Sequence, residues 1–221
     1  MTTDVDFEWF PGFSRSQKQQ SIASLHRAAA LELGFDDRLL LEISTKSPDG
    51  FGVQLSAFNL RISTADFGHT SVERAFQCSK VFRHAGYQGS LHEVEDLRMI
   101  KAAIREIDDE LVGFRFEGVD WALDARPGFY DFLYLRALQE AGNSDPSFLL
   151  KLEGFQGFTD IEFNPKRSYN CQAWSCAFFL AIGGGTGVEM MPKDVAAAQS
   201  WLEKMRPDLG EPTHQRSLFD G

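Results

Sequence analysis

The chain has 221 residues, of which 43% are hydrophobic, and a formal net charge of −10. This length and composition allow a proper core and favour one compact domain over two. The negative charge argues against a protein that binds duplex DNA by covering its phosphates with lysine and arginine. It does not exclude recognition of one modified nucleotide in a single strand or loop, which needs few phosphate contacts.

The first predicted helix spans residues 15–33, because apolar residues recur there at helical spacing after a capping box of Ser14 and Gln17. Residues 39–44 read as a short strand, and Ser47–Gly50 as a turn. Residues 53–62 alternate between polar and apolar side chains. We therefore expect a second strand there, paired with the first as a hairpin that ends close to the next segment.

The next segment, Ser71–Phe82, predicts a helix that carries one carboxylate and one amine. Glu73 and Lys80 are seven residues apart, which is two helical turns, so a helix would place them on one face with Cα atoms about 10 Å apart. This pair is compatible with acid/base or nucleophilic chemistry. Solvated surface charges would give the same pattern.

The remaining pattern indicates a mainly helical chain. Helices are expected at 91–110, 128–141, 170–182 and 192–205, a short strand at 114–121, and a loose tail at 206–221. We predict an α+β fold in which one mainly helical domain, residues 1–205, contains a small β-sheet or hairpin.

Cellular setting and metal content follow from simple counts. No stretch approaches the roughly eighteen apolar residues that cross a bilayer. The acidic start at residues 1–6 lacks the features of a secretory signal, so we expect a cytoplasmic protein without membrane contact.

Neither the three cysteines, Cys78, Cys171 and Cys176, nor the five histidines have ligand spacing. We expect buried thiols, no metal and no cofactor.

Two neighbouring motifs resemble the NADAR (YbiA-like) family. Leu55–Phe58 is similar to that family's "LSNF" element, with Ala57 in place of the usual asparagine. The segment after it resembles the family's "E-H-x-F-Q-A-x-K-F" helix, with arginine at the histidine position and one extra residue, Val81, before the last aromatic. The resemblance implies that these two elements build one pocket.

A third motif narrows the resemblance. Residues 157–173 look like the "FTDIEFNP…N-Q-A" signature of NADAR proteins encoded with DarT-type DNA ADP-ribosyltransferase toxins. Residues 9–18, 41–47 and 129–134 look similar to the same subgroup, so the resemblance spans about residues 7 to 182. It implies a NADAR/YbiA-like fold and an antitoxin whose functional partner is a DarT-type toxin.

The resemblance also implies an activity. Members of the subgroup remove ADP-ribose from guanine bases, so the expected substrate is ADP-ribosylated guanine in DNA, with a single strand favoured. Two alternatives stay open: an N-glycosidase that acts on a riboflavin-pathway intermediate, and a module that binds ADP-ribose without cleaving it. The oligomeric state is left open.

Four residues are candidates for catalysis. Glu73 and Asp160 would supply the two carboxyl roles of glycosidic cleavage. Alternatively, Lys80 or Lys46 would attack the opened ribose and form a Schiff base. A loop aspartate otherwise makes a turn or cap, and Lys46 beside a turn reads as an exposed charge.

Seven further residues are candidates for holding the substrate. Asn170 also fits a helix N-cap, and the two large aromatics could stack on a base but are more often core residues. The candidate binding residues are Ser56, Phe58, Asn59, Gln77, Trp121, Tyr130 and Asn170.

Overall fold

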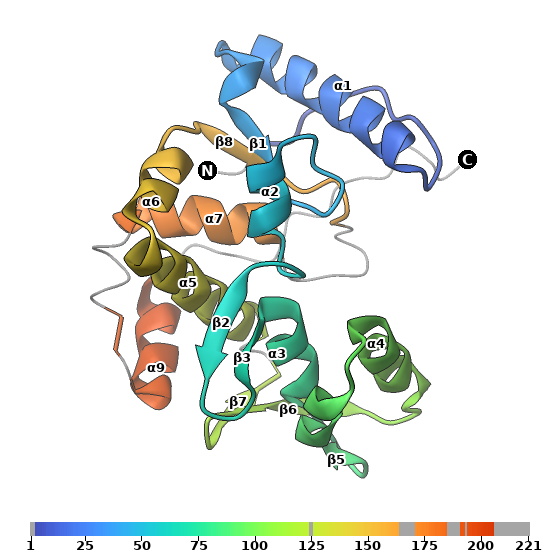
Figure 1. Cartoon of the computed structure of the whole chain (residues 1–221), viewed down its shortest axis with the longest axis vertical. Coiled ribbons are helices and arrows are strands. Elements are labelled where there is room, and N and C mark those ends of the chain that lie inside the picture. Colours follow the sequence, from blue (N-terminus) through green and yellow to red (C-terminus); the bar gives the residue numbers. More distant parts are fainter. Residues whose placement is uncertain (1–2, 124–125, 164–170, 185–190, 193, 206–221) are drawn as a thin grey trace.

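Helices and three small β-sheets form the fold in a computed structural model of the chain (Figure 1). The structure describes residues 3–123, 126–163, 171–184, 191–192 and 194–205. These residues form one α+β domain, as the sequence predicted. The predicted tail at 206–221 lies outside the described residues. No helix in the described part of the chain has the length and apolar content needed to span a membrane.

Helix α5, Arg126–Ser144, is the central element of the core. It contacts strand β2 (Arg61–Thr64) and the helices α3 (Val72–Cys78), α6 (Pro146–Glu153), α7 (Gln172–Ala181) and α9 (Val195–Met205). The side chains that it buries include Phe129, Tyr130, Phe132, Leu133 and Tyr134. The predicted helices at 128–141, 170–182 and 192–205 correspond to α5, α7 and α9.

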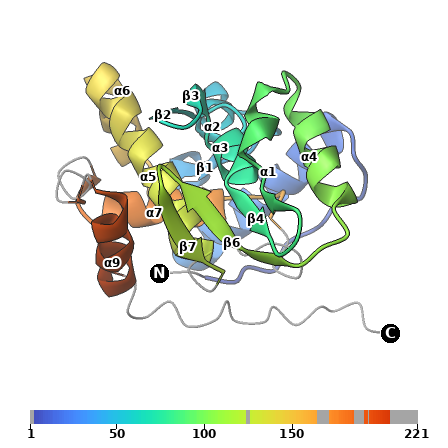
Figure 2. The same ribbon diagram turned by 90° about the horizontal axis from the view of Figure 1, so that it is seen from below.

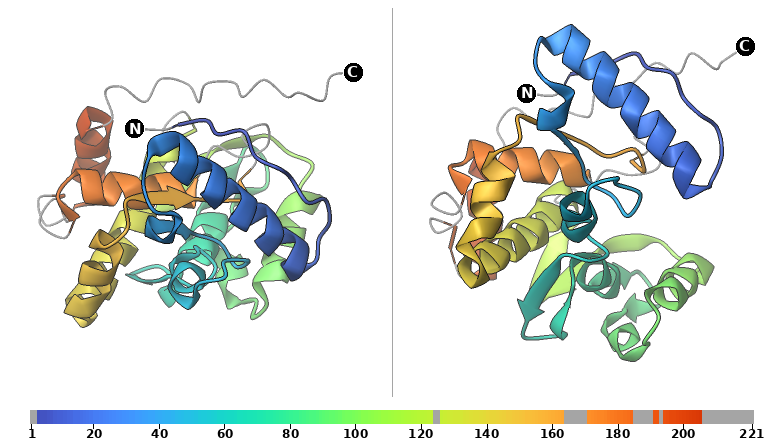
Figure 3. Two further views of the ribbon diagram at one scale, coloured as in Figure 1. Left: turned by 90° about the horizontal axis from the view of Figure 1, so that it is seen from above. Right: turned by 45° about the horizontal axis from the view of Figure 1, so that its top comes forward.

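Helix α1, Arg15–Leu33, begins and ends as the sequence predicted. The Ser14 and Gln17 side chains form the capping box, and Gly34 closes the helix at a φ of 74°, a conformation that glycine adopts without strain. Figure 3 shows α1 at one end of the molecule and α4, Leu97–Glu106, toward the other.

Strand β1, Leu40–Glu42, confirms the predicted short strand, but its predicted partner is wrong. After the 3-10 turn η1, Asp37–Leu39, it pairs in parallel with β8, Gly157–Thr159, a segment more than a hundred residues later. A local hairpin cannot provide this pairing, because parallel strands need a long crossover connection. The β1–β8 pair therefore places the start of the third motif beside residues 40–42.

The predicted strand at 53–62 is also wrong. Residues 50–55 form helix α2, Gly50–Leu55, because the Asp49 side chain caps its first turn by accepting a hydrogen bond from the Phe51 N–H. Gly52 lets this helix lie against β1, since a Cβ there would collide with the Glu42 carbonyl oxygen. The chain becomes extended only at β2, which pairs with β3, Gly68–Ser71.

A four-stranded antiparallel sheet has the strand order β5-β4-β6-β7, and Figure 2 shows its strands β4, β6 and β7. Its strands are β5 (Gly86–Tyr87), β4 (Lys80–Phe82), β6 (Leu111–Phe116) and β7 (Val119–Ala122). The single strand predicted at 114–121 is two strands. Glu117 and Gly118 both have positive φ, 47° and 78°, as a tight hairpin turn requires.

The helix predicted at 71–82 ends early, at Cys78. The Ser79 hydroxyl donates back to the Ala75 carbonyl, and Lys80 then pairs with Phe114 in the sheet. The preference of Val81 and Phe82 for strands therefore outweighs helical continuation. Lys80 lies on a strand, so the predicted two-turn spacing on one helical face is wrong.

The helix predicted at 91–110 is two shorter elements. The 3-10 helix η2, Gly89–Glu93, is followed by α4, whose N-terminus is capped by the side chain of Asp96. Because that cap begins a new helix, the apolar repeat read from the sequence crosses a break in the backbone.

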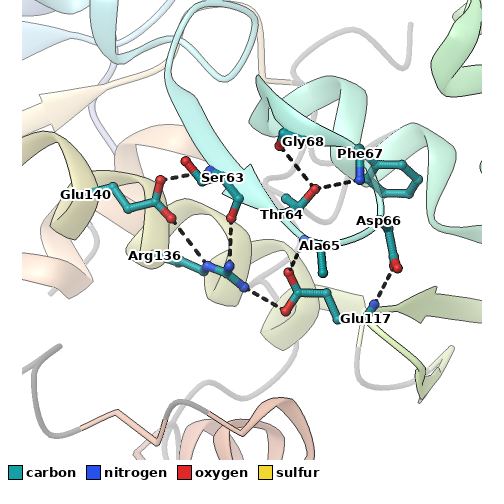
Figure 4. Close-up of polar contacts among 9 residues, drawn as sticks. All are labelled: Ser63, Thr64, Ala65, Asp66, Phe67, Gly68, Glu117, Arg136 and Glu140. Carbon is teal, nitrogen blue, oxygen red and sulfur yellow. Dashed lines mark hydrogen bonds and ion pairs between the residues drawn. The ribbon is translucent and has the colours of Figure 1, made fainter.

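Arg136 on α5 connects three elements through one guanidinium (Figure 4). It donates 2.6 Å to the Ser63 carbonyl on β2 and 2.9 Å to Glu117 in the β6–β7 turn. Glu140, on the next turn of α5, accepts from the Ser63 N–H at 2.8 Å. The Arg136 side chain is 27% exposed, so water partly screens these bonds.

Replacing Arg136 with methionine should lower the free energy of unfolding by about 1–3 kcal/mol, since Glu117 and the Ser63 carbonyl both lose their charged donor. Urea unfolding monitored by circular dichroism measures the change. The matched control is Arg38→Met, which removes an ion pair to Asp36 from a side chain that is 85% exposed. Equal effects in the two variants would contradict the connecting role of Arg136.

Candidate active site

The first two motifs meet at the start of α3. The Ser56 carbonyl accepts from the N–H groups of Asn59 and Leu60 at 2.7 and 2.8 Å, which folds residues 56–60 into a tight turn. The Glu73 N–H donates to the Ala57 carbonyl at 2.9 Å. The turn and the first residues of the helix therefore form one unit.

Glu73 is a nearly buried carboxylate in the first turn of α3. Its Oε1 accepts from Lys101 Nζ at 2.7 Å and from Gln77 Nε2 at 3.1 Å. The residues that the structure covers provide no hydrogen bond to its Oε2. One oxygen is thus fixed by the protein, while 12% of the side chain is exposed.

Lys80 reaches Glu73 through an amide rather than directly. Its Nζ donates to Gln77 Oε1 at 2.7 Å, and the Gln77 amide donates to Glu73. The ammonium also lies 5.6 Å from the centre of the Phe76 ring. The structure therefore brings three of the predicted residues, Glu73, Gln77 and Lys80, into one hydrogen-bonded chain.

Lys101 is a site residue that the sequence did not reveal. It comes from α4, and its amine lies both on Glu73 and 4.7 Å from the centre of the Phe58 ring. In the sequence it is one charge among several on an amphipathic helix. Its neighbours Ile100 and Ile104 are buried, and a lysine beside such an apolar stripe was the available signal.

Asp160 lies in the loop after β8 and is held by the start of α7. Its carboxylate accepts from the Gln172 side-chain amide at 3.1 Å, from the Gln172 N–H at 3.4 Å and from the Glu162 N–H at 3.1 Å. The Gln172 side-chain oxygen accepts from the Ala57 N–H at 2.6 Å. Gln172 therefore connects the Asp160 loop to the turn that carries Glu73.

Tyr130 is a buried phenol on α5. Burial raises its pKa well above the ordinary value, and the charges of Glu73 and Asp160 raise it further. The ring packs edge-on against Phe76, 5.5 Å between centres. Tyr130 is 4% exposed, so little of it is open to a ligand.

Comparison with known protein families identifies the family of this chain. The model of the DarT1-associated NADAR antitoxin family matches residues 1–211, which includes all three motifs. The chain belongs to this family. No curated protein matches the chain.

Three other predicted residues of this NADAR chain lie on or beside the turn. The Ser56 hydroxyl is buried, and the described residues offer it no hydrogen-bond partner. Phe58 is 40% exposed and carries Lys101 over its ring. The Asn59 amide donates to the Val53 carbonyl at 2.8 Å, so it stabilises the turn itself.

Two further predicted residues, Trp121 and Lys46, have no hydrogen bond, ion pair or ring contact to this cluster within the described part of the chain. Trp121 is 2% exposed in the core, where its ring packs on Phe129 and Phe132. Lys46 is half-buried in the loop after β1, and its carbonyl accepts from Gln19. Asn170 lies outside the described residues.

The cysteines are free and protonated at neutral pH. Burial raises the pKa of Cys78 to about 11 and the pKa values of Cys171 and Cys176 to about 12. A thiolate nucleophile needs the opposite shift, so the geometry gives these thiols no role in chemistry.

Asp160 should titrate at an unusually high pH. Burial raises its pKa to about 7, and the nearby negative charge of Glu42 adds to the shift. In protein labelled with ¹³C at the aspartate carboxyls, we expect a resonance with a midpoint near pH 7 that is absent from Asp160→Asn. A midpoint near the ordinary value of about 4 would contradict the geometry.

Proposed function

We propose that this protein is a hydrolase that removes ADP-ribose from guanine bases in DNA, and so reverses the modification made by a DarT-type toxin. Membership of the DarT1-associated NADAR antitoxin family supports this assignment. In its support, the cluster contains the two carboxyl groups that cleavage of a glycosidic bond requires.

The observation that carries the proposal is the Gln172 bridge. Through it, a cluster of one carboxylate and two lysines meets a second carboxyl group from a distant part of the chain. The two carboxyl groups have different neighbours: Glu73 is paired with a lysine, while Asp160 lies near a second acid. Such a difference separates the roles of the two groups.

Those neighbours suggest a division of labour. Asp160 keeps its proton to about pH 7 and acts as the general acid. When the bond between the ribose anomeric carbon and the guanine nitrogen breaks, its electron pair stays on nitrogen, which takes the proton of Asp160. Glu73 stabilises the positive charge on the sugar and accepts a proton from the attacking water. Free ADP-ribose and unmodified guanine are the products.

A covalent route through a lysine was the alternative, and the contacts favour water. Lys80 donates to Gln77, and no described contact joins Lys46 to the cluster around Glu73, so neither candidate amine is set up as a nucleophile. A nucleophilic amine must be unprotonated, with its lone pair directed at the sugar. We assign Lys101 to holding the Glu73 carboxylate, and Lys80 to orienting Gln77.

For binding, we assign Phe58, Ser56 and Gln77 to the substrate. The partly exposed Phe58 ring offers a stacking surface for a base, and stacking tolerates a single-stranded substrate. Ser56 has a buried hydroxyl without a described partner. We leave Trp121 in the core.

Single-stranded DNA that carries ADP-ribosylated guanine should release ADP-ribose when it is incubated with this protein. Glu73→Gln removes the negative charge and should lower kcat by about 10²-fold or more, and Asp160→Asn, which removes the proton donor, should act similarly. Chromatography of the released nucleotide measures both. The matched control is Glu162→Gln, a carboxylate two residues from Asp160 that is 39% exposed and pairs with Lys18.

The rival functions give other outcomes. Intact substrate with the wild-type protein would defeat the proposal. Calorimetric binding of ADP-ribose without turnover would then favour a reader, whereas hydrolysis of small ribosylamines alone would favour a riboflavin-pathway N-glycosidase.

Reductive trapping distinguishes the two chemical routes. If water attacks the sugar directly, sodium cyanoborohydride added during turnover should leave no ADP-ribose adduct on any lysine peptide, as measured by mass spectrometry. An adduct at Lys80 or Lys46 in the wild-type protein would contradict the direct route. Its absence from the matching Lys80→Ala or Lys46→Ala variant would identify the nucleophile.

A further inference from the structure

We propose that Glu42 is a positioning residue for Asp160: it fixes the loop on both sides of that side chain and places a second buried acid beside it. The inference rests on the proposed function for its role in catalysis. Its geometry, however, is independent of the substrate. Glu42 is absent from the predicted site, and it lies on β1, more than a hundred residues before Asp160 in the sequence.

The Glu42 carboxylate lies against the loop that carries Asp160. The residue is 1% exposed, and its two oxygens accept hydrogen bonds from the two residues that flank Asp160. Oε2 accepts from the Thr159 hydroxyl at 2.5 Å, and Oε1 accepts from the Ile161 N–H at 2.9 Å. Asp160 is therefore held between two points fixed by one carboxylate.

The backbone reinforces this contact. Glu42 is paired with Thr159 in the parallel register of β1 and β8, and the Ile43 N–H donates to the Thr159 carbonyl at 2.8 Å. On the other side, Gly52 allows α2 to press against the Glu42 carbonyl. Glu42 is therefore held within the β1–β8 strand pair.

His26 on α1 completes the arrangement. Its Nε2 lies 2.9 Å from the Thr159 hydroxyl, and burial lowers the pKa of His26 to about 4, so the ring is neutral at pH 7. A neutral ring protonated at Nε2 donates to the Thr159 oxygen, and the Thr159 hydroxyl in turn donates to Glu42. Burial raises the pKa of Glu42, and this direction of bonding opposes that shift by favouring the carboxylate.

The charge of Glu42 also acts on Asp160. The described titratable groups that act on or around Asp160 come from several elements: Glu42 on β1, Glu162 in the same loop, Tyr130 and Tyr134 on α5, and Cys171 and Cys176 at α7. Lys18 on α1 pairs with Glu162 in the same loop. Of these groups, Glu42 contributes the charge that raises the pKa of Asp160.

Glu42→Gln separates charge from position. A glutamine can still accept from the Ile161 N–H and can donate to the Thr159 oxygen, so the loop stays in place without the negative charge. The Asp160 resonance should then titrate at a pH lower by about half a unit or more. The matched control is Glu162→Gln, and an unchanged midpoint in Glu42→Gln would overturn the proposal.

Wild-type protein provides a test that does not depend on a variant's folding. In protein with ¹³C at the glutamate carboxyls, Glu42 should lose its proton at a lower pH than Asp160, because its charge must be present when Asp160 titrates. If Glu42 remained protonated through the Asp160 transition, the proposal would be wrong.

Activity provides the last readout. The alkaline limb of the kcat profile for ADP-ribose release should move to lower pH in Glu42→Gln by the same amount as the NMR midpoint, with no shift in the control. A loss of rate at every pH without a shift would indicate a structural role only and overturn the proposal. An inactive wild-type protein would refute the proposed function, and the NMR midpoints would still decide the role of Glu42.

Discussion

The side-chain amide of Gln172 is the contact on which the candidate site depends. Its oxygen accepts from the Ala57 N–H, so its NH₂ group must face Asp160, where it donates to the carboxylate. A flipped amide would lose both bonds, which fixes its orientation. Residues 115 apart in sequence are joined in this way. Without this amide, the turn above Glu73 and the Asp160 loop would be separate polar surfaces.

The sequence predicted the parts of the fold that are encoded locally. Helix α1 has apolar residues at helical spacing, a capping box and a terminal glycine, and α5 contains an aromatic-rich run that is buried nearly all round. The short strands failed for the opposite reason. Residues 53–62 alternate like a strand, yet Asp49 caps a helix there, and the partner of β1 lies beyond residue 150. Three-residue strands are specified by their partners, which a local pattern does not contain.

The difference between local and long-range encoding also explains which site residues the sequence revealed. Motif similarity led to Glu73, Gln77 and Asp160, because those residues lie within segments with a recognisable order. It did not include Lys101, and although the run 41–47 also resembles the subgroup, it assigned no role to Glu42. The contacts of both residues arise only when α4 and β1 pack against the motif segments. One signal for Glu42 was present in the sequence. A carboxylate within the apolar run Leu40–Ile43 is costly to bury, and such a residue usually has a defined set of donors.

Two of the chain's many acidic residues are buried close together at the candidate site. Acidic residues are in excess in the chain, and two of them, Glu42 and Asp160, lie close together where water cannot fully solvate them. Two adjacent carboxyl groups release their protons in separate steps, so one proton is retained at a pH where isolated acids have lost theirs. Glu73 instead has a lysine, Lys101, at 2.7 Å. In the proposed mechanism, the different roles of Asp160 and Glu73 therefore arise from their neighbouring residues rather than from the carboxyl groups themselves.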